Sequence, residues 1–157
     1  MLPWQLCRTA RIWPARRLGD LGDDVPEQKQ DRRKALGRQG EDLAVAYLVQ
    51  QDYHIITRNW RTRSGELDIV AREGDWLVFV EVRARRTRAG EPVPALGSPE
   101  ESVTTRKQLQ LITMADVYLF EMKWDGPWRI DVIALELLAD GSVARMNHLR
   151  DAIGGIV

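Results

Sequence analysis

The sequence predicts an α/β protein in which helices flank a mixed five-stranded sheet, in the order helix, three strands, helix, two strands. Three observations predict this fold class. Apolar residues recur at three- and four-residue spacing in two segments, which is typical of amphipathic helices. Apolar and polar residues alternate in other segments, as in strands with one buried face. The second helix separates the third and fourth predicted strands, and such a crossover predicts that the fourth strand runs parallel to a central one.

The first predicted helix spans about residues 31–51. Its apolar residues fall on one face, and they are Leu36, Leu43, Ala44, Tyr47 and Leu48. Gly37 and Gly40 are small enough to let the helix pack close to the sheet, which places Glu41 at the rim of the sheet. Glu41 is therefore either a ligand at a site on that rim or a solvated glutamate beside basic neighbours.

Residues 1–33 are predicted to form a mostly disordered basic N-terminal extension, and residues 34–157 to form the domain. The extension has three prolines and two glycines and no sustained apolar period. Its arginine-rich opening superficially suggests a transit peptide. A tail that contacts nucleic acid, or translation from an upstream start codon, explains the same composition.

The first strand is predicted at residues 54–60. A hairpin is predicted at residues 64–85, with the turn Glu73-Gly74-Asp75. The fourth and fifth strands are predicted at residues 128–138 and 143–149, joined by a turn with the Asp140-Gly141 signal. Asp131 lies inside the apolar fourth strand, and a pairing with Arg129 or His148 would make it a structural residue.

The second helix is predicted at residues 98–120 with two competing start signals. Ser98 and Pro99, followed by Glu101, match a capping box, whereas Thr104 offers a later start. Lys107 falls early in this helix. It is expected either to approach the proposed site or to remain in solvent.

The central hairpin carries three acids that a buried sheet should avoid. Because strand residues two apart share a face, Glu66 and Asp68 are expected to project together. The opposite face of that strand is expected to hold Leu67, Ile69 and Ala71. In the second strand, one face is expected to hold Phe79, Glu81, Arg83 and Arg85.

Pairing across the turn is expected to bring Asp68 near Glu81. Two carboxylates at hydrogen-bonding range repel each other unless a proton or a cation lies between them. A divalent metal ion meets that need, and hard oxygen ligands favour Mg²⁺ or Mn²⁺. Arg83 is placed to hold an anionic substrate or a developing negative charge. The alternative interpretation is a solvated strand face with cross-strand ion pairs.

Three motifs resemble the YraN family of uncharacterised bacterial proteins. They are Gly37-Arg38-Gln39-Gly40-Glu41, Gly65-Glu66-Leu67-Asp68 and Val78-Phe79-Val80-Glu81-Val82-Arg83. That family is assigned by similarity to the PD-(D/E)XK nuclease superfamily, near archaeal Holliday-junction resolvases. The resemblance covers roughly residue 35 to the C-terminus and implies a restriction-endonuclease-like core.

By position, the resemblance assigns Asp68 and Glu81 as metal-binding acids and Glu41 as an auxiliary acid. Glu41 or Glu66 is expected to add a direct or water-mediated ligand. Arg83 stands where the superfamily usually has lysine. The resemblance thus implies a metal-dependent nuclease for structured or branched DNA. The alternative is a non-catalytic nucleic-acid-binding or DNA-repair accessory protein that kept the fold after losing the lysine. Resolvase-like enzymes act as symmetric dimers, so a homodimer is expected by analogy.

The hairpin region is locally basic although the chain has a formal net charge of zero. Between residues 58 and 88, eight arginines outnumber five acids, which suits a phosphodiester backbone. The candidate nucleic-acid-binding residues are Arg61, Arg63, Arg85, Arg86, Lys107 and Gln108.

Composition limits the remaining classes. At 157 residues the chain suits one domain with a tail. Cys7 is the only cysteine, which excludes an internal disulfide and a cysteine-rich zinc site, and is consistent with the cytoplasm. No apolar run reaches the roughly 18 residues of a membrane span, so no membrane partner is expected.

Overall fold

The computed structural model describes residues 26–88 and 103–153. The elements are α1 (Pro26–Gln50), β1 (His54–Thr62), β2 (Gly65–Glu73), β3 (Trp76–Arg86), α3 (Thr105–Met122), β4 (Trp128–Leu137) and β5 (Val143–Ile153). The strands form one open sheet in the order β1-β2-β3-β4-β5. Neighbouring strands are antiparallel except β3 and β4, which are parallel as the crossover helix predicted. The predicted fold class is therefore confirmed.

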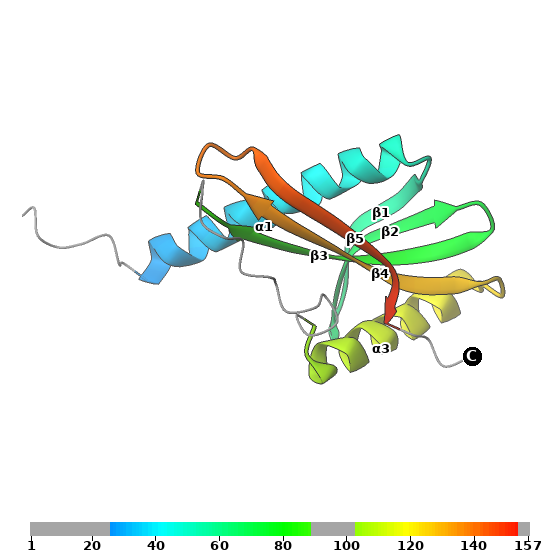
Figure 1. Cartoon of the computed structure of the whole chain (residues 1–157). Helices are drawn as coiled ribbons and strands as arrows, with labels where there is room; N and C mark the ends of the chain where they lie inside the picture. Colours follow the sequence, from blue (N-terminus) through cyan, green and yellow to red (C-terminus); the bar gives the residue numbers. More distant parts are fainter. Residues whose placement is uncertain (1–25, 89–102, 154–157) are drawn as a thin grey trace, which may run out of the picture.

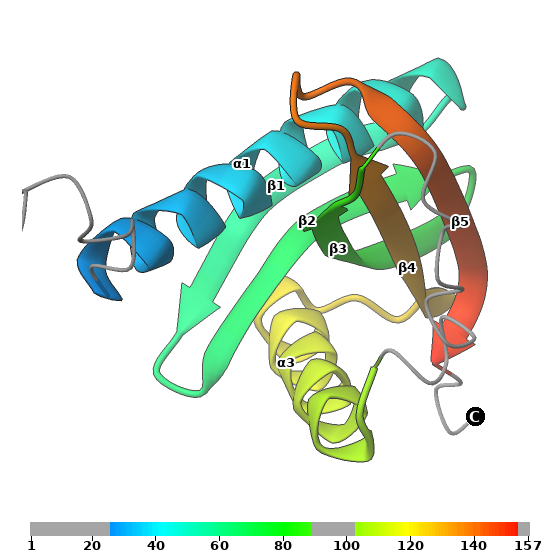
Figure 2. The ribbon, with the colours of Figure 1, turned by 60° about the vertical axis from the view of Figure 1, so that its left-hand side comes forward.

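The two helices cover opposite faces of the sheet (Figures 1 and 2). On the α1 face, Ala44 and Leu48 pack against apolar residues of β2, β3 and β4. On the α3 face, Leu111, Met114 and Tyr118 pack against a second apolar cluster. The central strands are buried on both faces, which explains their nearly continuous apolar sequence.

Gly40 marks the closest approach of α1 to the sheet. A Cβ atom added at Gly40 would lie 2.6 Å from the Cβ of Ala84 on β3, closer than such atoms pack. A Cβ added at Gly37 would meet nothing within 4 Å. Gly40 therefore has the predicted packing role, whereas the same expectation for Gly37 is wrong because that side of the helix faces open space.

α1 begins at Pro26, ahead of the predicted start near residue 31. Residues 26–33, which the sequence assigned to a disordered extension, are therefore helical. Proline is favoured in the first helical turn because its missing N–H has no partner there. The sequence pattern missed these turns because they contact no core and so have no apolar period. Residues 1–25 lie outside the described residues.

α3 starts at the second of its two predicted signals. Thr104 is the N-cap, and its side chain accepts a hydrogen bond from the backbone N–H of Lys107 at 3.3 Å. The capping-box signal at residues 98–101 lies outside the described residues. At the other end, Lys123 adopts a left-handed conformation that closes the helix. Neither described helix is long and apolar enough to cross a membrane.

The expected alternation of faces fails within β2. Leu67, Ile69 and Ala71 were expected to share one face. Ile69 and Ala71 do pack together on the α1 face, but Leu67 packs in the α3-side cluster. The break falls at Asp68. The β2–β3 ladder ends at the pair Ile69 and Val80, so β2 leaves β3 at this point. In β1, Asn59 adopts a positive φ of 53° between the partners of Leu67 and Ile69.

Candidate functional site

The divergence of β2 from β3 creates the candidate site. Beyond Ile69 the two strands no longer form a regular ladder. The carboxylate of Asp68 reaches across and accepts a hydrogen bond from the backbone N–H of Val82, with an Oδ2–N distance of 2.8 Å. Buried backbone donors need an acceptor. The Asp68 carboxylate therefore accepts the hydrogen bond that a β2 carbonyl would accept in a regular ladder. This hydrogen bond holds the carboxylate between β2 and β3.

Glu81 lies beside this gap on the α3 face and is only 4% exposed. Its Oε1 atom lies 3.0 Å from Nζ of Lys107 and 3.3 Å from Nε of Arg83. Its Oε2 atom is buried and has no hydrogen-bond partner among the residues that the structure describes. A buried carboxylate oxygen without a partner is costly, so the site is incomplete on the Oε2 side.

Asp68 and Glu81 act on each other electrostatically. Burial raises the pKa of Asp68, and the negative charge of Glu81 raises it further, to about 7. The hydrogen bond from Val82 and the charge of Lys107 oppose this shift, and the charge of Glu41 adds to it. The expected proximity of Asp68 and Glu81 is thus present, and their repulsion is only partly relieved by protein groups.

Glu41 lies close enough to Asp68 to raise its pKa, and both Glu41 and Glu66 have partners of their own. Glu41 Oε2 accepts a hydrogen bond from Nδ2 of Asn59 at 2.8 Å. Glu66 is about half exposed and forms a salt bridge with Arg61 at 3.0 Å, across the β1–β2 ladder. In residues 26–88 and 103–153, no three Asp, Glu, His or Cys residues form a group that could hold a metal ion. The structure therefore brings together a carboxylate pair.

A groove of ≈ 620 Å³ runs between α1 and the edge of the sheet. Seven residues line it: Lys34, Gly37, Arg38, Glu41, Asn59, Arg61 and Glu66. Two of the lining residues, Glu41 and Glu66, are acids, and three are cations. The groove between α1 and strands β1 and β2 is therefore lined by charges of both signs.

The Asp68–Glu81 pair fits a hard divalent cation. Its donors are carboxylate oxygens, which Mg²⁺ and Mn²⁺ prefer. Glu81 offers an unpartnered oxygen, and Asp68 has a raised pKa because a like charge lies nearby. Both features are relieved by a positive ion between the carboxylates. Mg²⁺ keeps several waters, so few protein ligands suffice.

The predicted nucleic-acid-binding residues occupy different environments. Arg63 is exposed, and Arg61 is paired with Glu66. Arg85 forms a salt bridge with the buried Glu136. Arg86 donates from Nη1 to the carbonyl oxygens of Leu138 and Ala139, both at 3.0 Å. Gln108 donates to the carbonyl of Val103 at 2.9 Å, which makes it part of the start of α3.

Two further residues contact acids near the proposed site: Lys107, which the sequence singled out as a candidate, and Asn59, which it did not. Lys107 was expected either near the site or in solvent; it lies 3.0 Å from Glu81 and is 23% exposed. Its position in the first turn of α3 was the available signal. Asn59 holds Glu41 in place, and asparagine tolerates the positive φ found there. No periodicity in β1 singled it out.

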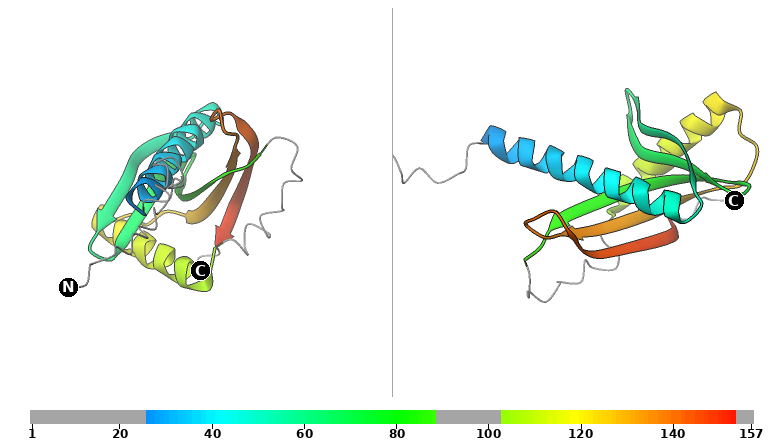
Figure 3. Two further views of the ribbon diagram at one scale, coloured as in Figure 1. Left: turned by 90° about the vertical axis from the view of Figure 1, so that its left-hand side faces the viewer. Right: turned by 90° about the horizontal axis from the view of Figure 1, so that it is seen from above.

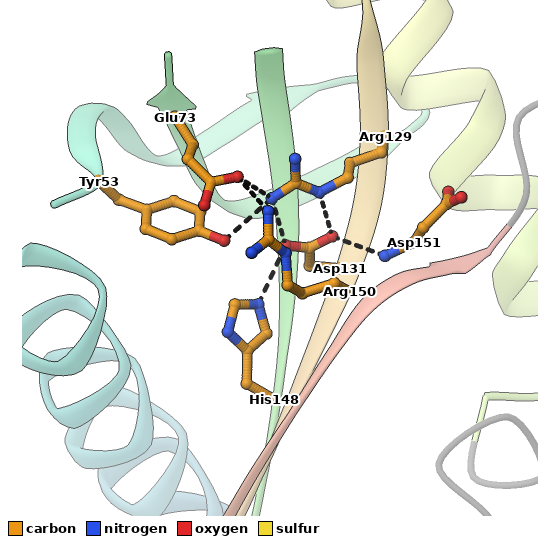
Figure 4. Close-up of polar contacts among 7 residues, drawn as sticks. All are labelled: Tyr53, Glu73, Arg129, Asp131, His148, Arg150 and Asp151. Atoms are coloured by element: carbon orange, nitrogen blue, oxygen red, sulfur yellow. Dashed lines mark hydrogen bonds and ion pairs between the residues drawn. The ribbon is translucent and has the colours of Figure 1, made fainter. Parts of the chain in front are cut away.

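A fully buried aspartate, Asp131, lies in β4 within a separate polar network (Figure 4). Arg129 donates from Nε to its Oδ1 at 2.9 Å, and the backbone N–H of Asp151 donates to the same oxygen at 2.9 Å. His148 Nε2 lies 3.0 Å from its Oδ2. Both predicted partners of Asp131, Arg129 and His148, are therefore confirmed.

The network continues outward from Arg129. Its Nη2 atom donates to the hydroxyl of Tyr53 at 2.9 Å and to Glu73 at 2.8 Å, and Glu73 also pairs with Arg150. Burial would raise the pKa of Asp131, but the hydrogen bonds from His148, Arg129 and the Asp151 backbone outweigh burial and lower it. No buried side-chain atom of this network lacks a hydrogen-bond partner among the described residues, and we assign the network a structural role.

The fold and the site define an α/β protein with a mixed five-stranded sheet and, where two central strands diverge, a carboxylate pair of one buried and one half-buried acid. The chain belongs to the uncharacterised protein family UPF0102, whose family model matches residues 40–135. This is the YraN family that the motifs indicated, and the match includes Glu41, Asp68 and Glu81.

Curated relatives extend the similarity over most of the chain. A UPF0102 protein of Geobacter sulfurreducens is 48% identical over 120 residues, which cover 76% of this chain and 88% of the relative. A UPF0102 protein of Rhodococcus opacus is 44% identical over 120 residues, covering 75% of this chain and 95% of the relative. One from Geotalea uraniireducens is 43% identical over 128 residues, covering 80% and 95%.

Proposed function

We propose that the protein is a metal-dependent nuclease that hydrolyses phosphodiester bonds in structured or branched DNA. The observation that carries this proposal is the Asp68–Glu81 pair. Its oxygens are hard donors, and one of them has no hydrogen-bond partner in the described part of the chain. The pKa of Asp68 is raised to about 7 by burial and by Glu81. Sites with strongly perturbed carboxylates of this kind are candidates for chemistry.

Asp68 and Glu81 would hold the Mg²⁺ or Mn²⁺ ion, and Glu41 or Glu66 would contribute through water. When bound, such an ion supplies Lewis-acid chemistry at a phosphoryl oxygen. The hydrogen bond from Val82 fixes the orientation of Asp68, and burial fixes that of Glu81. The chain thus supplies two acids whose positions are set by β2 and β3.

Lys107 would supply the cationic group that the family resemblance places at position 83. Its ammonium group lies 3.0 Å from Glu81 and is partly exposed, so it can face a bound phosphate. A lysine can also lose its proton, which arginine cannot do in a protein. Arg83 is 39% exposed and has a planar guanidinium, which suits a bidentate phosphate contact. In this proposal Lys107 supplies the lysine near the reacting phosphate, and Arg83 binds a phosphate through its guanidinium.

The test is a cleavage assay with Mn²⁺ on duplex, single-stranded, flap and four-way DNA. Wild type should cut at least one substrate, and Asp68→Asn and Glu81→Gln should abolish cutting. Glu121→Gln, which removes an exposed acid of α3, should cut like wild type. Arg83→Lys should retain activity, because the site uses Lys107 for the lysine chemistry. Cleavage that survives Glu81→Gln would mark a contaminating nuclease.

Mn²⁺ binding provides an independent readout. Calorimetric titration should detect binding to wild type and to Arg83→Lys, and little or none to Asp68→Asn. Equal affinity in wild type and Asp68→Asn would place the metal elsewhere. DNA binding without cleavage by wild type or Arg83→Lys on any substrate would favour the non-catalytic accessory protein.

A further inference from the structure

The first turns of α1 form a basic arm that extends beyond the sheet. Figure 3 shows the N-terminal end of α1, in blue, projecting past the strands. The side chains of residues 28–35 are all exposed, in contrast to the buried Ala44 and Leu48 further along the helix. This part of α1 adds no buried apolar surface. Its side chains are therefore accessible to a partner.

The arm forms one wall of a second groove, of ≈ 530 Å³. The groove is lined by Lys29, Arg32, Arg33, Ala35, Leu36, Arg86 and Ala139. Four of these residues are cations, and none is an acid. Arg86 is held in place by its two hydrogen bonds to the carbonyls of Leu138 and Ala139. Lys29, Arg32 and Arg33 form no salt bridge with any described residue.

We propose that this groove binds the phosphate backbone of a nucleic acid. The cations at positions 29, 32 and 33 follow helical spacing, so they share one side of α1. The helical rise places Lys29 and Arg33 about 6 Å apart along the axis. Unneutralised cations in a row attract a chain of phosphates, and their aliphatic stems line the groove with Ala35 and Leu36.

The composition of the arm argues against an anionic membrane. A helix that lies in a membrane interface needs an apolar face with large side chains. Residues 28–35 read Gln-Lys-Gln-Asp-Arg-Arg-Lys-Ala and contain no large apolar residue. Charge attracts such a segment to phosphates, but nothing on it inserts into lipid. A nucleic-acid backbone is therefore the polyanion that this surface fits.

The groove lies on the side of α1 away from the groove that contains Glu41 and Glu66. On its other flank, α1 contributes Lys34 and Arg38 to the ≈ 620 Å³ groove that contains Glu41 and Glu66. One helix thus presents cations to both sides, with the proposed active site on one side only. On the basis of the proposed nuclease function, the basic arm anchors a duplex segment away from the bond that is cut. This would favour substrates with more than one arm.

The experiment measures binding of a fluorescent 30-base-pair duplex by anisotropy across a range of salt concentrations. Arg32→Gln/Arg33→Gln should weaken binding about 10–100-fold near 0.1 M salt and reduce the slope of log affinity against log salt by about 2, one contact per cation. The matched control is Lys123→Asn/Arg145→Gln, which removes two exposed cations elsewhere and should leave the slope unchanged. Asparagine suits the left-handed backbone at position 123.

The outcomes separate this inference from the proposed function. Asp68→Asn should bind the duplex like wild type without cutting it, and Arg32→Gln/Arg33→Gln should keep its Mn²⁺ affinity. Two results together would support the groove and reject the nuclease. The wild type would bind DNA without cutting it, and only the arm variant would lose binding. Equal slopes in wild type and the arm variant would overturn the groove. So would equal losses in the arm and control variants, or arm-dependent binding to phosphatidylserine vesicles without binding to DNA.

Discussion

Asp68 and Asp131 lie on β2 and β4, on either side of β3, and they differ in what surrounds them. Asp131 is fully buried and receives hydrogen bonds from Arg129, His148 and a backbone N–H, which lower its pKa. Asp68 receives one backbone hydrogen bond and faces Glu81, and its pKa rises to about 7. Burial favours protonation in both cases. The partners decide the direction of the shift.

The comparison separates a structural acid from a candidate functional one. The Asp131 network satisfies its charges within the protein, so an added cation would gain nothing there. In the Asp68–Glu81 pair, Glu81 Oε2 has no hydrogen-bond partner within residues 26–88 and 103–153, and the two acids repel each other. A buried site that remains incomplete in the protein alone has a physical reason to bind something else.

The largest effect is expected from Asp131→Asn, which removes the charge that neutralises the buried Arg129. Breaking a buried ion pair costs about 3–5 kcal/mol of unfolding free energy, measured by urea denaturation at pH 7. The control Asp75→Asn, at a side chain that is 95% exposed, should change little. Because the folded-state pKa of Asp131 is lowered, its contribution is present above aspartate's usual pKa and is lost as the pH falls below it. A loss below about 1 kcal/mol would show that the network is not structural.

Asp68→Asn in metal-free protein is expected to raise the unfolding free energy, by less than Asp131→Asn lowers it. The folded-state pKa of about 7 lies above the ordinary value of 3.8. Wild type should therefore lose stability as the pH rises from about 4 to 7. Asparagine lacks this charge and should stabilise the fold at pH 8 by about 1–3 kcal/mol, with the difference vanishing near pH 4. Thermal or urea unfolding in EDTA at both pH values measures it. Destabilisation at pH 8 would contradict the repulsion between Asp68 and Glu81.

The smallest effect is expected from Lys107→Met. The charge of Lys107 lowers the pKa of Asp68, so removing it should raise that pKa above the wild-type value. Carbon-detected NMR titration of the Asp68 carboxyl in metal-free protein reports the change. Arg106→Met removes the exposed neighbouring cation and should shift the titration less. An equal shift in both variants would mean that general charge, rather than the contact with Glu81, controls the site.

The sequence by itself determined the features that depend on local pairing. The turn at Glu73-Gly74-Asp75 set the register of β2 and β3, because a hairpin register follows from its turn. That register predicted the nearness of Asp68 and Glu81. The crossover helix predicted the parallel pairing of β3 with β4. Period-two alternation also assigned the faces of β3 correctly, since a strand buried on both sides stays regular.

Only the tertiary structure decided where regular patterns end and where distant elements meet. The divergence of β2 at Asp68 arises from packing on opposite faces, which no alternation encodes. Lys107 reaches Glu81 because α3 packs on the sheet through Leu111, Met114 and Tyr118, which turns its first turn toward β3. The basic arm of α1 has no apolar period because it touches no core. Helix docking and helix extension beyond the core are set by long-range packing and charge, whereas sequence patterns report local burial.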